Sequence, residues 1–402
     1  MGAANCLLHV IRKTGLKLFI RELFEYIFLV IAYAFLRMLF MFKHRRLEAV
    51  LLLKPEGIGD LVIFTAVLPD IRVFYGEKKI VLVVRQEARE LFEQCPYVDE
   101  VIGIDYERYL NNLLYRMKVL HSLFSLRPEV SFYPAYSRGY VGEQLALLSG
   151  AKFKYAVRHS NRNRYNIFYT MLFPISEALP EIDKYRKFFA KLKISSPKIH
   201  PTELWFSEKD RDAVNSLLQR HGIADRQFII LFPGARYRIK CWQASKFSEL
   251  VSHIARDFPE LVFVVAGDEK DRVHYENLRS ELNLIPDKKI IDFTGETNLR
   301  ELGILIGMAK VYIGADTGAL HMAVAVGTPT VCIMGGGHFG RFFPYGDLKK
   351  NRIVYHHMDC YGCNWMCIYD GAMYNGARCI RRINVDNVYN EFKNLFMGIE
   401  TP

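Results

Sequence analysis

Short apolar runs recur along most of the chain, and each is followed by a stretch with helical spacing. A first series, rich in Val, Ile and Leu, predicts strands near 49–54, 80–84, 101–104 and 129–133, each with a helix after it. A second series predicts strands near 228–232, 261–266, 289–292, 310–313 and 329–333 and helices at 244–257, 270–283, 298–308 and 317–326. Buried strands that alternate with helices are typical of doubly wound, mostly parallel sheets. The pattern therefore predicts two α/β domains.

The two series are separated by the segment 195–201, SSPKIHP, which has the composition of a linker. We therefore expect one domain at 47–197 and a second at 198–402, with a cysteine-rich insertion at 360–379 in the second. Two halves of similar size joined by a short linker predict a cleft between their facing sheet edges.

Residues 1–46 differ in composition from the rest of the chain. Charged residues Lys17, Arg21 and Glu25 recur every four positions, and an apolar run from 26 to 36 precedes Arg37 and the basic group at 43–46. The apolar run is shorter than the roughly 20 residues that a spanning helix needs, which favours a helix lying in a membrane interface. A helix docked on the protein's own surface is the alternative. The absence of a small-residue cleavage site argues against a removed signal peptide.

Charge and cysteine content narrow the possible partners and the compartment. Half of the 402 residues are hydrophobic, and the formal net charge is +11, with a pI of about 9.1. This balance favours anionic partners such as nucleotide phosphates, nucleic acid or an acidic membrane surface. Nucleic acid is disfavoured by the lack of a basic helix or an RNA-binding signature, and a P-loop by the lack of G-K-[ST]. Eight scattered and clustered cysteines fit a reducing cytoplasm better than a secreted disulfide scaffold.

A candidate anion site lies in the stretch YIGADTGALHMAVAVGTPTVCIMGGG. Asp316 and Thr317 occupy the positions of a helix N-cap, and Gly318 permits close approach of a ligand to the first turn. Unpaired amides at such a turn bind anions, and His321 follows on the opening turns of the helix. The second glycine cluster, 335–337, suggests a phosphate-lined crevice at the carboxyl edge of the sheet. Alternatively, Asp316 is only a cap and His321 an ordinary helix residue.

Two further polar stretches lie in the first half of the chain. The turn KPEGIGD contains Asp60 but has Val62 in place of the third glycine of G-x-G-x-x-G, so a dinucleotide fold is not supported there. The stretch RHSNRNRY, which contains Arg158, Arg162 and Arg164, predicts an exposed loop that faces solvent or an anion.

Four cysteines gather near the end of the chain, at Cys360, Cys363, Cys367 and Cys379. Four thiolates are the tetrahedral ligand set of structural zinc, which makes a structural zinc site one hypothesis. The C-x3-C spacing is not that of a standard zinc ribbon. Clustered free thiols or a redox-labile disulfide are the alternatives, and a catalytic role is not expected.

Three stretches, in this order, resemble glycosyltransferase family 9, which includes the lipopolysaccharide heptosyltransferases. They are LLLKPEGIGDLVIFTAVLPDIR, LFPGARYRIKCWQASKFSEL and YIGADTGALHMAVAVGTPTVCIMG, and together the resemblance spans roughly residues 49–390. The chain departs from the family pattern after the last core strand, where GGGHFGRFFPYG replaces a G-P-T type turn.

The resemblance implies a GT-B architecture of two Rossmann-like domains, with the acceptor bound mainly by the first and a nucleotide-sugar by the second. It implies transfer with inversion and without a metal or other required cofactor. Asp60 would be the catalytic base, and Arg158, Arg162 and Arg164 would serve the acceptor. The donor's diphosphate would be held by Lys240 and the helix start at Asp316, Thr317, Gly318 and His321. Asp271, or alternatively Glu269, would bind the ribose.

These assignments predict a membrane-associated glycosyltransferase at the cytoplasmic face of the inner membrane. The expected donor is an ADP-sugar, most readily an ADP-heptose, and the expected acceptor is a lipid-linked core saccharide of lipopolysaccharide or a related glycan. The alternative is a non-catalytic nucleotide-binding scaffold of a membrane-associated glycan assembly. Retention of Asp60, Lys240, Asp316 and His321 together argues against that alternative.

Overall fold

The chain folds as two compact units that interleave along the sequence. The computed structural model describes residues 48–158, 164–282, 289–369, 371 and 376–400, together with Ile27 and Ile31. The first unit comprises the chain up to Pro55, Glu77–Gln86 and Ile104–Pro174, and the second comprises Glu56–Gly76, Glu87–Gly103 and Ile175–Pro402. Interleaved units do not test a division at a single residue, so the domains 47–197 and 198–402 stay a prediction.

The first sheet has the strand order β3-β2-β1-β4-β5-β6. Its strands are β1 (Ala49–Lys54), β2 (Lys79–Arg85), β3 (Glu100–Ile104), β4 (Pro128–Tyr133), β5 (Phe153–Arg158) and β6 (Met171–Pro174). β1 pairs in parallel with β2 and β4 and is buried along its whole length, as a strand covered on both faces must be. The first unit also contains α4 (Tyr106–Asn111), α5 (Leu113–Ser125) and α6 (Tyr140–Leu148). Asp105 and Asn112 cap α4 and α5 by accepting hydrogen bonds from backbone amides.

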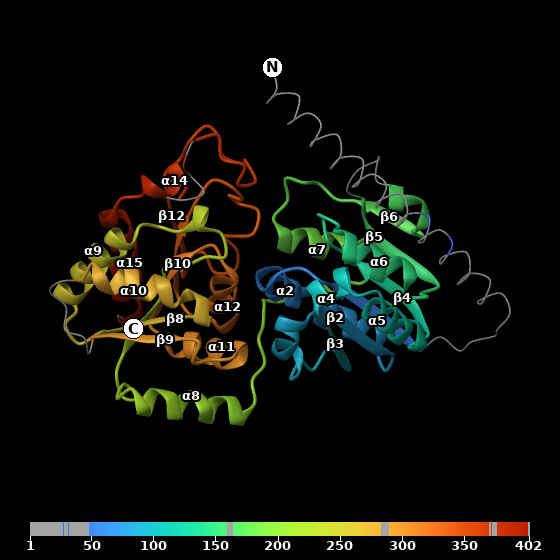
Figure 1. The fold of residues 1–402 in the computed structure, drawn as a ribbon, viewed down its shortest axis with the longest axis horizontal. Coiled ribbons are helices and arrows are strands. Elements are labelled where there is room, and N and C mark those ends of the chain that lie inside the picture. Colours follow the sequence, from blue (N-terminus) through green and yellow to red (C-terminus); the bar gives the residue numbers. More distant parts are fainter. Residues whose placement is uncertain are drawn as a thin grey trace, which may run out of the picture. The chain divides into compact units, whose positions relative to one another are not determined.

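The second sheet, with the order β12-β11-β10-β7-β8-β9, is parallel throughout. Its strands are β7 (Phe228–Phe232), β8 (Val262–Gly267), β9 (Ile290–Thr294), β10 (Val311–Ala315), β11 (Thr330–Met334) and β12 (Asn351–Tyr355). One face carries α9 (Ala244–Asp257), α10 (Arg272–Ser280) and α15 (Val385–Glu400), and the other carries α8 (Glu208–Arg220), α11 (Leu299–Met308) and α12 (Gly318–Val326) (Figure 1). Apolar side chains from the strands, α9 and α15 form the core of the first of these faces.

Helices from early in the chain also belong to the second unit. These are α2 (Ile58–Phe64), α3 (Leu68–Tyr75) and α7 (Glu181–Ala190). α2 packs against both α12 and α7, and the ring of Phe64 on α2 meets Tyr185 on α7 edge-on, with centroids 5.4 Å apart. The turn that carries Asp60 is therefore fixed within the same unit as the second sheet.

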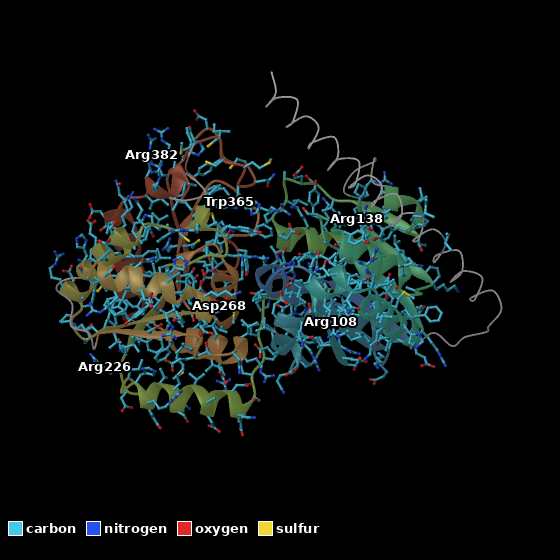
Figure 2. The ribbon with its side chains drawn as sticks, in the orientation of Figure 1. Arg108, Arg138, Arg226, Asp268, Trp365 and Arg382 are labelled. Carbon is cyan, nitrogen blue, oxygen red and sulfur yellow. The ribbon has the colours of Figure 1, made fainter. Side chains whose placement is uncertain are left out.

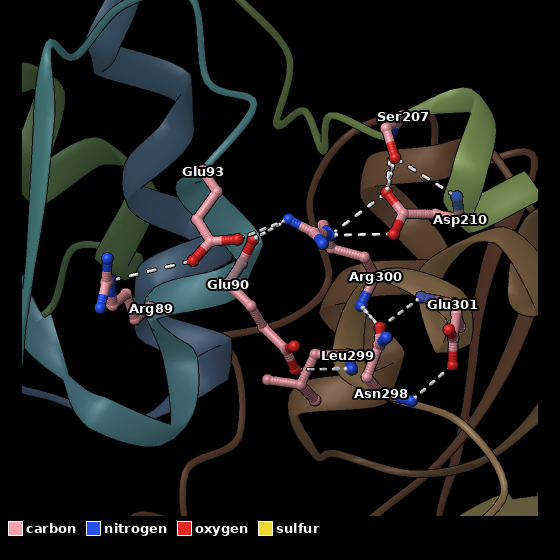
Figure 3. Close-up of polar contacts among 9 residues, drawn as sticks. All are labelled: Arg89, Glu90, Glu93, Ser207, Asp210, Asn298, Leu299, Arg300 and Glu301. Carbon is pink, nitrogen blue, oxygen red and sulfur yellow. Dashed lines mark hydrogen bonds and ion pairs between the residues drawn. The ribbon is translucent and has the colours of Figure 1, made fainter.

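A polar network ties the segment after β2 to the helices of the second sheet (Figure 3). The Arg300 guanidinium on α11 contacts the carboxylates of Glu93 at 2.7 Å and Asp210 at 3.2 Å. The Glu90 carboxylate accepts a hydrogen bond from the backbone N–H of Leu299 at the start of α11, at 2.8 Å. A carboxylate at this position is favoured by the helix dipole.

Each predicted strand is confirmed to within two residues at either end, and the α/β class is confirmed with it. β5, β6 and β12 were not predicted, because they carry polar, charged or proline residues that weaken the apolar signal. The proposed membrane helix in residues 1–46 lies outside the described residues, apart from Ile27 and Ile31. Among the residues described, none of the helices combines the length and the apolar character needed to cross a membrane.

Candidate active site

The turn between β10 and α12 brings several polar groups together at the carboxyl end of β10. Thr317 is the N-cap of α12 and has an extended backbone, so the first amides of the helix begin at Gly318. The N-cap makes no side-chain capping bond, and Asp316 turns its carboxylate to other partners. Oδ2 of Asp316 lies 3.7 Å from Lys240 Nζ, and Oδ1 lies 3.5 Å from His321 Nε2. The residues predicted to hold the donor's diphosphate are thus neighbours.

Asp316 is a buried carboxylate held between two nitrogen-bearing side chains. Burial would raise its pKa, but the hydrogen bond from His321 and the charge of Lys240 lower the pKa below its usual value overall. Lys240 also donates a hydrogen bond to the main-chain oxygen of Asp316, at 3.1 Å. The ammonium group is therefore drawn to the mouth of the α12 turn, where amides and lysine together provide positive potential for an anion.

His321 is held from both sides by hydrogen bonds. Its Nδ1 lies 3.1 Å from the hydroxyl of Tyr345, and the two rings stack with centroids 5.7 Å apart. Burial raises the pKa of Tyr345, so the hydroxyl stays protonated and can donate to Nδ1. With Nδ1 accepting, Nε2 carries the proton that faces Asp316. The imidazole is a linker between Asp316 and Tyr345 in this arrangement rather than an ordinary surface residue of a helix.

Asp60 stands in the first turn of α2 and is half-buried. α2 packs on α12 at two glycines: a β-carbon at Gly59 would lie 2.6 Å from Cδ2 of His321, and one at Gly318 would lie 3.1 Å from the Ile58 side chain. This close packing leaves no room for a side chain at Gly59 and little room for one at Gly318. The G-I-G-D and D-T-G-x-x-H elements, distant in sequence, are therefore in direct contact.

The predicted ribose ligand Asp271 takes part in local structure. It accepts a hydrogen bond from the backbone N–H of Asp268 and completes a capping box for the 3-10 turn Glu269–Asp271. Its carboxylate also lies against the turn after β7, where a β-carbon at Gly234 would be 3.0 Å from Oδ1. Burial and the nearby Asp268 charge raise the pKa of Asp271. Glu269 lies against Gly295 instead, so the choice between the two carboxylates stays a prediction.

The glycine turn after β11 adds residues that the sequence did not indicate. His338 follows Gly335–Gly337, and burial, then the charges of Lys240 and Arg341, lower the pKa of His338 to about 4. Arg341 contacts the Glu181 carboxylate at 3.3 Å, and the buried Lys184 ammonium contacts the same group at 3.1 Å. In the sequence, the only feature that could have indicated His338 is its position directly after the glycine cluster. The contacts of His321 with Tyr345 and of Arg341 with Glu181 arise from tertiary packing, which the local sequence does not reveal.

The arginines assigned to the acceptor lie away from these elements in the chain. Arg158 ends β5 in the first unit and is exposed. Arg162 falls among the residues that the structure does not describe, and only the backbone of Arg164, at the start of a 3-10 turn, is described. Their role in acceptor binding stays a prediction.

The four clustered cysteines line one small cavity together with Trp365, Tyr361 and Tyr369. All four are free thiols. The Cys379 sulfur accepts a hydrogen bond from the backbone N–H of Gly336 at 3.5 Å. Within the described ranges, no three His, Cys, Asp or Glu side chains are grouped closely enough to hold a metal ion. The structural zinc, the redox-labile disulfide and the free-thiol alternatives all stay predictions.

The two parallel-sheet α/β units define a GT-B-like α/β fold. The sequence model described as glycosyltransferase family 9 (heptosyltransferase) matches residues 144–366, more than half of the chain. The chain belongs to this family. The matched region contains Lys240, Asp316 and His321 but not Asp60.

Known proteins with related sequences and structures agree with this assignment. Lipopolysaccharide heptosyltransferase 3 of Escherichia coli is 21% identical over 284 residues, which cover 69% of this chain and 80% of that protein. The solved structure of the E. coli ADP-heptose lipopolysaccharide heptosyltransferase II has a TM-score of 0.68 at 19% identity and covers 88% of this chain and 100% of that chain. TibC, an iron-containing dodecameric glycosyltransferase from enterotoxigenic E. coli, has a TM-score of 0.54 at 16% identity and covers 89% of this chain and 81% of that one.

Proposed function

We propose that this glycosyltransferase transfers a heptose from an ADP-heptose donor to a core saccharide of lipopolysaccharide or a related glycan, with inversion and without a metal ion. The observation that carries the proposal is the contact between α2 and α12, which joins the turn of Asp60 to the turn of Asp316. The names of the similar proteins support a heptose, an ADP donor and a lipopolysaccharide acceptor. We place the reaction at the cytoplasmic face of the inner membrane, where nucleotide-sugars are available.

In this mechanism Asp60 is the general base. Its carboxylate takes the proton of the acceptor hydroxyl, while that oxygen forms a bond to the anomeric carbon of the donor. The bond from the anomeric carbon to the β-phosphate oxygen breaks, and ADP leaves with the electron pair. Attack from the face opposite the leaving group inverts the anomeric configuration.

The leaving diphosphate gains negative charge as the bond breaks and needs positive potential. The Lys240 ammonium and the amides at the start of α12 supply it, and the helix dipole has the same sign. Because these groups are already held together by Asp316, no reorganisation is needed when the charge develops. His338, with its low pKa, is neutral at physiological pH and adds no charge.

The decisive experiment is a binding and turnover series with the full chain. ADP should stabilise the protein against thermal unfolding, by about 2.7 kcal/mol at 100 times its dissociation constant, while UDP and GDP should do so less. ADP-heptose and a delipidated core saccharide should then give a product whose anomeric configuration, read by NMR, is opposite to that of the donor. EDTA should leave the rate unchanged.

Each result bears on a different part of the proposal. Retention of the anomeric configuration would exclude direct displacement by an Asp60-activated hydroxyl. Loss of turnover in EDTA with recovery in Mg²⁺ would exclude the metal-independent account. ADP binding without turnover on any core saccharide would favour the non-catalytic nucleotide-binding scaffold.

A further inference from the structure

The cysteine-bearing loop between β12 and α14 (Arg378–Arg381) is joined directly to the glycine turn of the donor site. The backbone N–H of Gly362 donates to the carbonyl of Gly336 at 2.8 Å, and that of Asn364 donates to the carbonyl of Gly337 at 3.0 Å. Asn364 and Trp365 both adopt positive φ, at 50° and 63°. A left-handed backbone at two successive non-glycine residues is costly, and it persists only where surrounding contacts fix it.

These contacts place the Trp365 side chain against the glycine turn. Trp365 is one of the residues labelled in Figure 2. A β-carbon at Gly337 would lie 2.3 Å from the indole, and one at Gly335 would lie 2.8 Å from it. The indole N–H is buried and has no hydrogen-bond partner among the residues described. The ring is thus positioned by packing rather than by a hydrogen bond, and its π face is the part available for an interaction.

That face is turned to Lys240, whose ammonium nitrogen lies 5.1 Å from the ring centroid. A cation at this distance over tryptophan is attracted by the ring quadrupole. On other sides the same ammonium meets the main-chain oxygen of Asp316 at 3.1 Å and its carboxylate at 3.7 Å. Four rotatable carbon bonds separate a lysine ammonium from its backbone, so these contacts together define where the charge stands.

We propose that Trp365 is a positioning residue, which holds the Lys240 ammonium in place for the diphosphate of the donor. The inference rests on the proposed function, because it needs Lys240 to bind the donor. The inference gives the cysteine-bearing loop a role although none of its residues takes part in the reaction. The loop carries the indole ring that positions a phosphate-binding lysine. Trp365 acts through Lys240 and not on the reacting atoms.

The test measures ADP affinity by calorimetry, and donor KM and kcat, for the full chain and its variants. Trp365→Leu should weaken ADP binding and raise donor KM by about 3- to 30-fold, the range of a cation–π contact, and should also lower kcat, because Lys240 faces the charge that develops on the leaving diphosphate. Trp365→Phe should restore most of the affinity, because it retains an aromatic face. Tyr369→Leu is the matched control: this ring lines the same cavity but lies over Arg378, at 4.9 Å, so donor binding should not change.

A double-variant comparison separates positioning from general packing. In a Lys240→Met background, Trp365→Leu should cause no further loss of ADP affinity, because its partner is already absent. The same loss in both backgrounds, or no loss in either, overturns the inference, and ADP binding together with turnover by the wild type would then uphold the proposed function on its own. A wild-type chain that binds no ADP overturns both.

If Trp365→Leu fails to fold, the contact between Trp365 and Lys240 can be tested by replacing the lysine instead. The emission of Trp365, obtained by subtracting the spectrum of each Trp365→Phe counterpart, should shift when Lys240 becomes Met. An unchanged difference spectrum would show that the ammonium does not contact the ring in solution.

Discussion

The imidazole of His321 lies so close to Gly59 that a β-carbon on Gly59 would come within 2.6 Å of Cδ2. Gly59 directly precedes Asp60, and His321 is hydrogen-bonded to Asp316 and Tyr345. A single glycine therefore sets the separation between the proposed base and the proposed phosphate site. The contact explains why this turn needs glycine without invoking a phosphate bound to it.

Gly59→Ala should reduce both stability and turnover. In an unconstrained helix alanine would stabilise, so a loss measures the clash with His321. We expect a decrease of about 1 to 3 kcal/mol in the free energy of unfolding, typical of overpacking, and a fall in turnover as α2 shifts. Gly57→Ala is the matched control, because a β-carbon there meets nothing within 4 Å and Gly57 has an ordinary φ of −77°. Equal urea midpoints for the two variants would contradict the packing account.

Asp60→Asn should abolish proton transfer while keeping the shape of the turn. We expect turnover to fall by about 100-fold or more, as for a lost general base, with ADP affinity within a factor of about two of wild type. Calorimetry and steady-state kinetics on one preparation distinguish the two effects. Wild-type turnover in this variant would remove Asp60 from the mechanism.

The apolar pattern predicts the central strands well because they are buried on both faces. β1, β7 and β11 are buried at every position, so their sequences are continuous Val, Ile and Leu-rich runs. The edge strand β12, NRIVY, mixes polar and apolar residues and gives no such signal. Continuous apolar runs in the sequence therefore identify the strands that are most deeply buried.

The candidate site divides in the same way. Residues within glycine-marked turns, such as Asp60 and Asp316, stand out in the sequence because the turn itself is local. Tyr345 contacts His321, and Trp365 contacts Lys240, through tertiary packing. Their local sequences contain no pattern that predicts these contacts. For Asp271 the local sequence pointed to a structural role. The stretch GDEKD has the pattern of a capping box, and in the structure the Asp271 carboxylate takes part in that capping box.

Arg300→Met should destabilise the second unit. The guanidinium bridges Glu93 and the buried carboxylate of Asp210 (Figure 3). Among the residues that the structure describes, removing it leaves the Asp210 carboxylate with its contacts to Ser207 alone. We expect a loss of about 1 to 3 kcal/mol in urea unfolding, the cost of an uncompensated buried acceptor. Arg89→Met removes an exposed contact to the same Glu93, at 3.8 Å, and should cost less than about 0.5 kcal/mol. Similar losses in the two variants would refute the distinction.

Stability should fall in mildly acidic solution because of His338. Its pKa is about 4 in the folded chain, against about 6.5 for an unperturbed histidine. Between these values the unfolded chain binds the extra proton, so the free energy of unfolding decreases as the pH falls from 6.5 towards 4. The groups that set this environment are Lys240, Arg341, Asp316 and Glu181.

His338→Asn should therefore show a weaker dependence on pH. Between pH 7.5 and pH 5 the wild type should lose on the order of 1 to 2 kcal/mol more than the variant, measured by urea unfolding in buffers of equal ionic strength. An identical loss in both proteins would mean that His338 is protonated as readily in the folded as in the unfolded chain.

A chain that begins at Leu47 should leave the membrane fraction and keep its activity on a soluble, delipidated acceptor. The removed segment combines the apolar run at 26–36 with basic residues at 17, 21 and 43–46, a composition suited to an anionic interface. Each basic residue near lipid phosphates adds on the order of 1 kcal/mol, so high salt should weaken attachment of the full chain without abolishing its apolar part.

A full chain with Lys43, Arg45 and Arg46 replaced by Gln is the matched control, and should bind anionic vesicles less well at low salt but equally at high salt. On a lipid-embedded acceptor the shortened chain should be slower, because attachment raises the effective concentration of that acceptor. Sedimentation of the shortened chain with membranes would show that another part of the chain attaches, and its failure to fold would show that residues 1–46 belong to the globular body.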